Sequence, residues 1–143
     1  NQLKHLVTSF KGNYNVYIGY NEELAHLIYA GSDFLLMPSR VEPCGLNQMY
    51  SLRYGTIPVV RRTGGLKDTI VDFEDADGNG ICHDQASAED VYDAIKRAFD
   101  LFKDKEKIMQ IRIKGLNIDH SWKNVSQEYI ELYNLIIAKS YEK

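Results

Sequence analysis

The sequence predicts an α/β fold, in which a parallel sheet carries helices on both faces and the chain ends in a helical segment. Two observations lead to this prediction. Short apolar runs alternate with amphipathic stretches through residues 15–83, which is typical of parallel strands joined by crossover helices. The run at residues 33–38 is apolar at consecutive positions, as expected for a strand that is covered on both faces.

Four segments are short, apolar and bounded by turn residues, and therefore predict strands: residues 15–20, 33–38, 56–61 and 80–83. Apolar residues recur at helical spacing between and after these segments, which predicts helices at residues 3–10, 22–31, 46–54, 66–71, 91–102, 105–114 and from 122 onward. Glycines 31 and 55 would end two of these helices. Asn21 is a good N-cap, and Ser87 with Asp90 resembles a capping box.

Two expectations concern the surface and the C-terminus. Residues 72–80 are acidic and rich in turn residues, so we expect a surface loop. Trp122 stands on the apolar stripe of the last helix and is expected to anchor it in the core. Residues 1–118 would form part of an α/β domain. Residues 119–143 would form a C-terminal helix that packs on this domain or on another one.

Composition excludes several classes of protein. The chain has 143 residues, enough for one domain, and 17 basic against 20 acidic residues give a net charge of −3. This balance argues against a nucleic-acid partner and against binding to a membrane surface. The two cysteines exclude a disulfide scaffold, and the four histidines lack metal-ligand spacing, so we expect neither a metal nor a cofactor. The sequence is that of a cytoplasmic protein, and its start at Asn1 suggests a piece of a longer chain.

Ligands of parallel α/β sheets bind beyond the carboxyl ends of the strands, and three predicted loops meet there: residues 19–20, 39–45 and 61–65. The second loop places Glu42 three residues before Gly45, at the start of a helix. Free N–H groups at a helix start suit phosphate oxygens, whereas a carboxylate suits sugar hydroxyls. The pair therefore fits a nucleotide-sugar. Taken singly, Glu42 is better explained as a solvated charge at a helix start, and Gly45 as an ordinary turn glycine.

Residues 38–70, PSRVEPCGLNQMYSLRYGTIPVVRRTGGLKDTI, resemble the signature segment of bacterial glycogen synthases and plant starch synthases. Residues 18–39 and the final helix beginning SWKNVSQEYIELY fit the same family, so the resemblance covers nearly the whole chain. It implies a retaining, two-domain glycosyltransferase of the GT-B fold. Such an enzyme transfers glucose from ADP-glucose to the non-reducing end of an α-1,4-glucan. This chain would be most of its Rossmann-like, donor-binding C-terminal domain.

The resemblance also implies roles for particular residues. Glu42 would be the catalytic residue, holding a hydroxyl of the donor glucose and favouring positive charge at the anomeric carbon. Tyr20 would pack on the adenine. The turn under the glucose and the diphosphate would consist of Cys44, Gly45, Leu46, Asn47 and Gln48. Asn47 departs from the usual threonine of the family, whereas position 50 carries tyrosine, as is usual for glycogen synthases.

The next loop holds residues that either face the site or support it from behind: Arg61, Arg62, Thr63 and Gly64. The cations that clamp the diphosphate in this family lie upstream of the chain. We therefore expect the isolated chain to be inactive, and its bare apolar surface favours a homo-oligomer. Two alternatives stay open. The chain is an isolated nucleotide-binding module, or its parent is a related retaining transferase that uses UDP-glucose.

Overall fold

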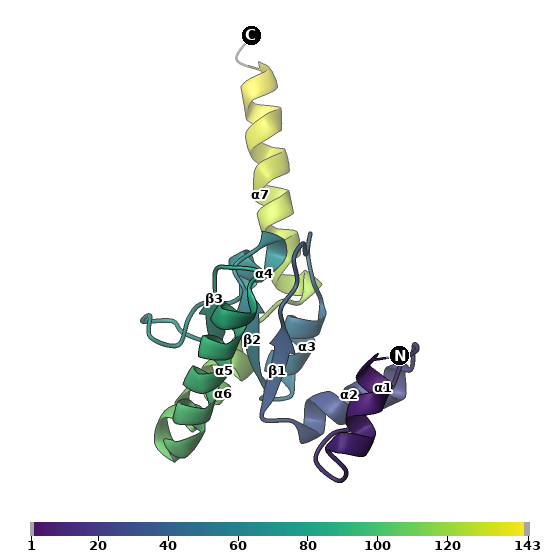
Figure 1. Ribbon diagram of the computed structural model, residues 1–143. Coiled ribbons are helices and arrows are strands. Elements are labelled where there is room, and N and C mark those ends of the chain that lie inside the picture. Colours follow the sequence, from purple (N-terminus) through teal and green to yellow (C-terminus); the bar gives the residue numbers. More distant parts are fainter. Residues whose placement is uncertain (1, 142–143) are drawn as a thin grey trace.

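The computed structural model describes residues 2–141 and has a three-stranded parallel sheet at its centre (Figure 1). The strands β1 (Phe34–Met37), β2 (Ile57–Arg61) and β3 (Ile81–His83) lie side by side in that order. Phe34 is in register with Ile57. A sheet of parallel strands separated by helices confirms the fold class that the sequence predicts.

Seven helices accompany the sheet in the described part of the chain: α1 (Gln2–Ser9), α2 (Glu22–Gly31), α3 (Asn47–Arg53), α4 (Gly64–Thr69), α5 (Ala88–Lys103), α6 (Lys105–Asn117) and α7 (Trp122–Tyr141). The local signals at the start of two helices act as the sequence indicates. The Asn21 side chain accepts a hydrogen bond from the Leu24 amide, and Ser87 accepts one from the Asp90 amide. The capping box at Ser87 is not closed, however, because the Asp90 carboxylate accepts hydrogen bonds from the amides of Asp84 and Gln85 instead.

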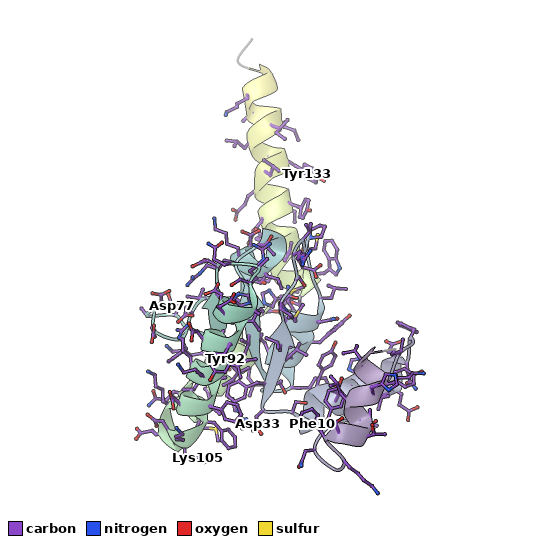
Figure 2. All side chains as sticks on the ribbon, in the orientation of Figure 1. Phe10, Asp33, Asp77, Tyr92, Lys105 and Tyr133 are labelled. Carbon is purple, nitrogen blue, oxygen red and sulfur yellow. The ribbon has the colours of Figure 1, made fainter. Side chains whose placement is uncertain are left out.

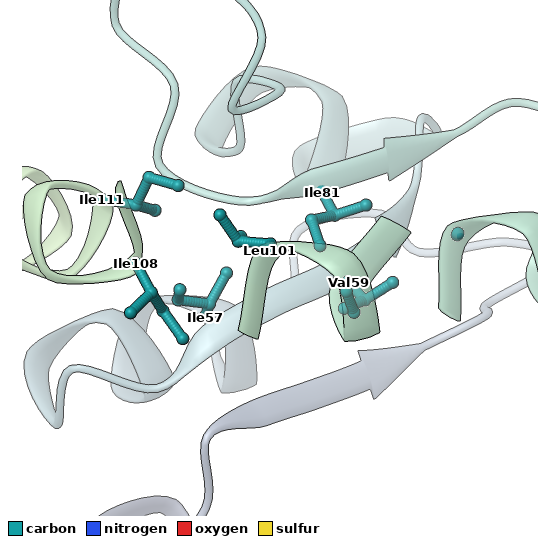
Figure 3. Close-up of a cluster of buried hydrophobic side chains, with 8 residues drawn as sticks. Ile57, Val59, Ile81, Leu101, Ile108 and Ile111 are labelled. Carbon is teal, nitrogen blue, oxygen red and sulfur yellow. The ribbon is translucent and has the colours of Figure 1, made fainter. Parts of the chain in front are cut away.

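The core has two halves because β2 sends alternate side chains to opposite faces of the sheet. On one face, α5 and α6 cover a cluster that is shown in part in Figure 3: Ile57, Val59, Ile81, Ala94, Ala98, Leu101, Ile108 and Ile111. On the other face, α3 and α4 cover a second cluster: Met37, Leu52, Val60, Leu66, Ile70 and Cys82. Burial on both faces explains why β2 and β3 are apolar at consecutive positions. The expectation that β1 is covered on both faces is wrong, because its Leu36 side chain is 41% exposed at the edge of the sheet.

The prediction of a buried strand at residues 15–20 is wrong. The segment has no regular secondary structure, and the side chains of Tyr17 and Ile18 are 57% and 63% exposed. A strand forms only where a neighbouring strand accepts its hydrogen bonds, and within residues 2–141 no strand lies beside this segment. Residues 15–20 are mostly apolar, but the described sheet has no strand beside them that could pair with their backbone.

The prediction that Trp122 anchors the last helix in the core is also wrong, because its side chain is 77% exposed. Helix α7 leaves the body of the molecule as an isolated rod, and Figure 2 shows Tyr133 projecting from it with no other element alongside. Its apolar side chains are therefore open to solvent: Tyr129, Ile130, Leu132, Tyr133, Leu135, Ile136 and Ile137. None of the helices within residues 2–141 combines the length and the apolar character that a membrane crossing requires.

The other edge of the body is bare as well. Within the described residues, β1 pairs only with β2, so its outer edge has no strand partner. An apolar hollow of about 370 Å³ opens between β1 and α5, lined by Asp33, Phe34, Leu36, Val59, Ile95, Ala98, Phe99 and Phe102. The body thus exposes apolar surface at one edge of its sheet in addition to that on α7.

Residues 72–80 form a loop whose middle is exposed, with Asp77 at its tip in Figure 2, but whose ends are buried. Residues 74–77 are exposed, as expected for a surface loop, whereas Asp72 at the start of the loop is only 5% exposed. Its carboxylate accepts hydrogen bonds from the Arg97 side chain and the Cys82 amide, at 2.5 and 2.7 Å. Burial alone raises the pKa of Asp72. These bonds and one from the Glu74 amide outweigh it and hold that pKa below the usual aspartate value.

The Asp72 carboxylate should stabilise the fold in a pH-dependent way. Because its pKa is lower in the folded than in the unfolded chain, the stabilisation is complete above the unfolded value, about 4, and is lost as the pH falls through the folded value. Asp72→Asn is expected to lower the free energy of unfolding by about 1–3 kcal/mol at pH 7. Urea unfolding at a series of pH values should show this difference shrinking below about pH 4.

The matched control is Asp77→Asn, at the exposed tip of the same loop, which should change little at any pH. A difference for Asp72→Asn that stays constant from pH 7 to pH 3 would show that the charge of Asp72 does not matter.

Candidate functional site

Since the strands are parallel, the loops that follow β1, β2 and β3 meet at one edge of the sheet. The loop after β1 is the longest of the three and carries Glu42 and Gly45 before α3 begins at Asn47. The turn after β2 carries Thr63 and leads directly into α4. Two of the three loops that the sequence places at the carboxyl edge are therefore there. The third, at residues 19–20, belongs to the segment that is not a strand.

The turn before α3 needs its glycine. Gly45 has a φ of 75°, in the left-handed region that other residues avoid, which agrees with the expected backbone position. Beneath this turn lies Gln48, which is fully buried and donates to the carbonyls of Cys44 and Gly45 and to the Thr69 hydroxyl, at 3.2, 3.0 and 3.2 Å. Gln48 thus holds the turn from behind with its side chain.

Helix α3 starts without a side-chain cap, because Leu46 occupies the N-cap position. Within the described residues, the amides of Leu46 and Asn47 donate to no protein acceptor. Unpaired amides at a helix start carry partial positive charge and are suited to an anionic group.

Glu42 lies half-buried in the middle of the loop, and its Oε2 atom is 3.5 Å from the Ser39 hydroxyl. No metal-binding group of three or more His, Cys, Asp or Glu residues is found in the described part of the chain. The Glu42 carboxylate is therefore free to accept hydrogen bonds from a ligand, as sugar hydroxyls would donate them.

The Glu42 loop rests on the first turn of α4. The Gly65 amide donates to the carbonyls of Glu42 and Pro43, each at 3.2 Å. A Cβ atom on Gly64 would lie 1.9 Å from the Glu42 carbonyl oxygen, and one on Gly65 would lie 2.0 Å from that of Cys44. The Thr63-Gly64-Gly65 motif therefore allows two backbone segments to approach closely. At Gly64 and Gly65 its glycines support the loop rather than facing a ligand.

The two arginines after β2 are placed differently. The Arg61 guanidinium donates to the carbonyls of Ser39, Arg40 and Asp84. Arg62 points to the exposed surface, where it pairs with the Asp84 carboxylate at 3.2 Å. Arg61 thus supports the loop, and Arg62 makes a surface ion pair.

A second part of the candidate site lies between α2 and α3. The side chain of Tyr20 is 88% exposed and borders a hollow of about 400 Å³ together with Leu46 and Asn47. The remaining lining residues are Gly19, Asn21, Glu22, Ala25, His26, Tyr29 and Tyr50. The structure therefore brings Tyr20 to the start of α3, although the two are 26 residues apart in the sequence. An open aromatic ring beside a hollow is suited to stacking on a planar group.

The aromatic floor of this hollow was not identified from the sequence. Tyr29 and Tyr50 contact each other at a ring-centroid distance of 6.2 Å, and His26 lies 5.7 Å from Tyr50. These residues come from two helices, and only their spacing within α2 (positions 26 and 29) hinted at a shared face.

The two cysteines occupy contrasting environments. Cys44 is exposed on the turn before α3, where the sequence places it in the site. Cys82 is buried in β3, and this burial raises the pKa of its thiol to about 11. Cys44 is therefore the accessible thiol of the pair, and Cys82 is part of the core.

An uncapped helix start next to a polar loop, at the carboxyl edge of a parallel sheet, is the arrangement by which Rossmann-like domains bind nucleotides and their sugars. The chain belongs to the family described as Glycosyl transferases group 1, which matches residues 1–115.

The chain is similar to several glycogen synthases. The chain is 67% identical to the glycogen synthase of Flavobacterium johnsoniae over 138 residues, which cover 96% of this chain and 29% of that protein. It is 47% identical to the glycogen synthase of Rhodospirillum rubrum, covering 95% of this chain and 28% of that protein. The chain thus spans less than a third of the length of these relatives.

Solved structures show the same fold. The catalytic domain of starch synthase IV from Arabidopsis thaliana, bound to ADP and acarbose, matches 96% of this chain and 29% of its own, with a TM-score of 0.84 and 37% identity. The sucrose-phosphate synthase of Thermosynechococcus elongatus matches 96% of this chain and 34% of its own, with a TM-score of 0.69 and 21% identity. At 21% identity, the similarity to the sucrose-phosphate synthase shows a shared fold only. These matches agree with the predicted glycogen synthase and starch synthase family and with a GT-B type of domain.

Proposed function

We propose that this chain is the donor-binding part of a longer glycogen or starch synthase that uses ADP-glucose. The observation that carries the proposal is the 37% identical starch synthase structure, which superposes on 96% of this chain and was solved with ADP. The hollow beside Tyr20 and the unpaired amides at the start of α3 offer this chain an aromatic surface and an anion-binding helix start, as a nucleoside diphosphate requires.

In this proposal the adenine stacks on Tyr20. The diphosphate lies over the turn formed by Cys44 and Gly45 and over the first amides of α3, at Leu46 and Asn47. Gln48 acts through its side chain on the shape of this turn, because it is buried beneath it. Glu42 accepts a hydrogen bond from a hydroxyl of the glucose.

The reaction breaks the bond between the glucose C1 and the diphosphate oxygen and forms a bond from C1 to the 4-hydroxyl oxygen of the glucan. The hydroxyl proton is lost and ADP leaves. Positive charge develops on the sugar as the first bond breaks, and the negative charge of Glu42 stabilises that charge more than it stabilises the uncharged sugar.

Further parts of the proposal concern the rest of the longer protein. That part would bind the α-1,4-glucan and supply the cations for the diphosphate, and residues 119–143 would pack on it through the exposed side chains of α7. The longer protein would be cytoplasmic, without a nucleic-acid or membrane partner. On its own, the chain would self-associate through the apolar surface beside β1 and along α7.

A chimera tests the transfer activity. This chain replaces the matching segment of the Flavobacterium johnsoniae glycogen synthase, to which it is 67% identical, and the product is called the chimeric synthase. With labelled ADP-glucose and glycogen, the chimeric synthase should incorporate glucose at a rate within about tenfold of the parent enzyme, because the site geometry is carried by the exchanged segment. The 143-residue chain alone should incorporate none.

Nucleotide choice and the role of Tyr20 are tested in the same protein. ADP should bind more tightly than UDP in calorimetric titration, and Tyr20→Ala should weaken ADP binding by about 10-fold, the loss of one stacked ring. Tyr92→Ala removes another exposed tyrosine, on α5 and away from the hollow, and should leave ADP binding unchanged. A folded chimeric synthase with no transfer activity, or with a preference for UDP-glucose, would contradict the proposal.

A further inference from the structure

Among the described residues, the Arg61 guanidinium is bound by main-chain atoms alone. Its Nε donates to the Ser39 carbonyl at 2.8 Å, its Nη2 donates to the Arg40 carbonyl, and its Nη1 donates to the Asp84 carbonyl at 3.3 Å. Ser39 and Arg40 follow β1, Arg61 ends β2 and Asp84 follows β3. One side chain therefore ties together the carboxyl ends of all three strands.

This arrangement requires an arginine. The guanidinium carries five N–H donors in a rigid planar fork, so it can bind acceptors in several directions at once. A lysine ammonium at the same position is a single point and cannot span the three carbonyls. No carboxylate pairs with Arg61 among the described residues, so its charge is matched only by the carbonyl dipoles.

Two of the three carbonyls that Arg61 binds, those of Ser39 and Arg40, lie at the start of the loop that carries Glu42. Ser39 is three residues before Glu42 and its hydroxyl lies 3.5 Å from the Glu42 carboxylate. Arg61 thus fixes the entry to the loop, while the Gly65 amide fixes its middle through the carbonyls of Glu42 and Pro43. The loop is held at both points by contacts to its backbone.

We propose that Arg61 is a positioning residue for Glu42: by binding the carbonyls of Ser39, Arg40 and Asp84, its guanidinium sets where the Glu42 carboxylate meets the donor sugar. This inference rests on the proposed function for its catalytic consequence. It assigns to Arg61 no contact with substrate. A displacement of the carboxylate by about 1 Å would be enough to slow the transfer, since catalytic groups act only in a narrow range of geometry.

The test uses Arg61→Lys and Arg61→Met in the chimeric synthase. Both variants should lower kcat by roughly 10-fold to 10²-fold, while the KM for ADP-glucose and the Kd for ADP stay within about 3-fold. KM and Kd should change little because Tyr20 and the start of α3, which are proposed to bind the nucleotide, stay in place. Amide hydrogen exchange should rise about 10-fold or more in residues 39–45, and lysine should not restore either property.

Arg112→Met is the control for lost stability. Arg112 binds the Asp33 carboxylate at 2.5 Å, at the opposite end of β1. This variant removes a contact between α6 and the start of β1, but kcat and the exchange of residues 39–45 should not change.

The outcomes separate the two proposals. Unchanged kcat and unchanged loop exchange in both Arg61 variants would overturn the positioning role. Equal losses in the Arg61 and Arg112 variants, in proportion to melting temperature, would do the same, because stability alone would explain them. Increased loop exchange in the Arg61 variants of a folded but inactive chimeric synthase would support the link from Arg61 to the loop, and the proposed function would fail by itself.

Discussion

Replacing Glu42 by alanine in the chimeric synthase is expected to lower kcat by about 10²-fold or more, with the Kd for ADP nearly unchanged. The carboxylate accepts no strong hydrogen bond from the protein, its Ser39 contact being 3.5 Å long, so its acceptor capacity is available to the sugar. It is separate from the hollow that Tyr20 borders, whose lining does not include Glu42. Loss of the carboxylate should therefore affect the chemical step and not the binding of the nucleotide.

Steady-state kinetics and calorimetric titration with ADP measure the two effects separately. Glu42→Gln keeps the shape of the side chain but removes the charge and replaces one acceptor oxygen with an NH2 donor, so a similar loss of kcat would show that the full carboxylate is required. Glu89→Gln, on an exposed carboxylate of α5, is the matched control. Turnover of the alanine variant near that of the unmodified chimera would show that Glu42 is only a capping charge.

Gly65→Ala is expected to have an effect of similar size through the backbone. Gly65 does not need a left-handed conformation, so alanine is excluded by space alone: its Cβ would lie 2.0 Å from the Cys44 carbonyl oxygen. Neither of the two backbone segments can give way as a side chain would. The loop should be pushed away from α4, with a cost in stability of about 1–3 kcal/mol and a loss of kcat on the order of 10²-fold.

Thermal melting and kinetics of the chimeric synthase measure both consequences. Gly31→Ala at the end of α2 is the matched control, because an added Cβ there meets nothing within 4 Å. A Gly65→Ala variant with normal melting and normal turnover would mean that the loop and α4 are less tightly packed than the structure shows.

The sheet could be predicted from the sequence wherever both faces of a strand are covered. Consecutive apolar residues at positions 57–60 reported that burial directly. At positions 34–37 the same pattern predicted the strand but overstated its burial, because Leu36 is 41% exposed at the open edge of the sheet. The same reasoning failed at residues 15–20 because an apolar pattern reports a preference for burial, whereas a strand also needs a neighbour that accepts its hydrogen bonds. It failed at Trp122 for a related reason: the stripe on α7 is real, but no described element packs against it.

The site could be predicted in part. Glu42 and Gly45 could be proposed because a carboxylate and a glycine before a helix have chemical meaning without knowledge of distant contacts, and the structure places both in the loop after β1. The role of the Arg61 side chain could not be found, because its partners are backbone carbonyls 21 to 23 residues away, and a carbonyl leaves no mark in the sequence. The same holds for Asp72, whose acidic neighbours suggested solvent, whereas Arg97 on α5 pairs with it at 2.5 Å.

The backbone contacts of the Glu42 loop also determine which of its positions tolerate substitution. Every amino acid presents the same carbonyl, so Arg61 holds positions 39 and 40 through atoms that mutation does not alter. Val41, which is 79% exposed, is under no steric restriction from its neighbours. Mutational tolerance should therefore be high at Arg40 and Val41 and close to nil at Gly64 and Gly65, although all four lie within the same few ångströms of folded chain. A library of loop variants can therefore randomise Arg40 and Val41 while Gly64 and Gly65 are kept unchanged.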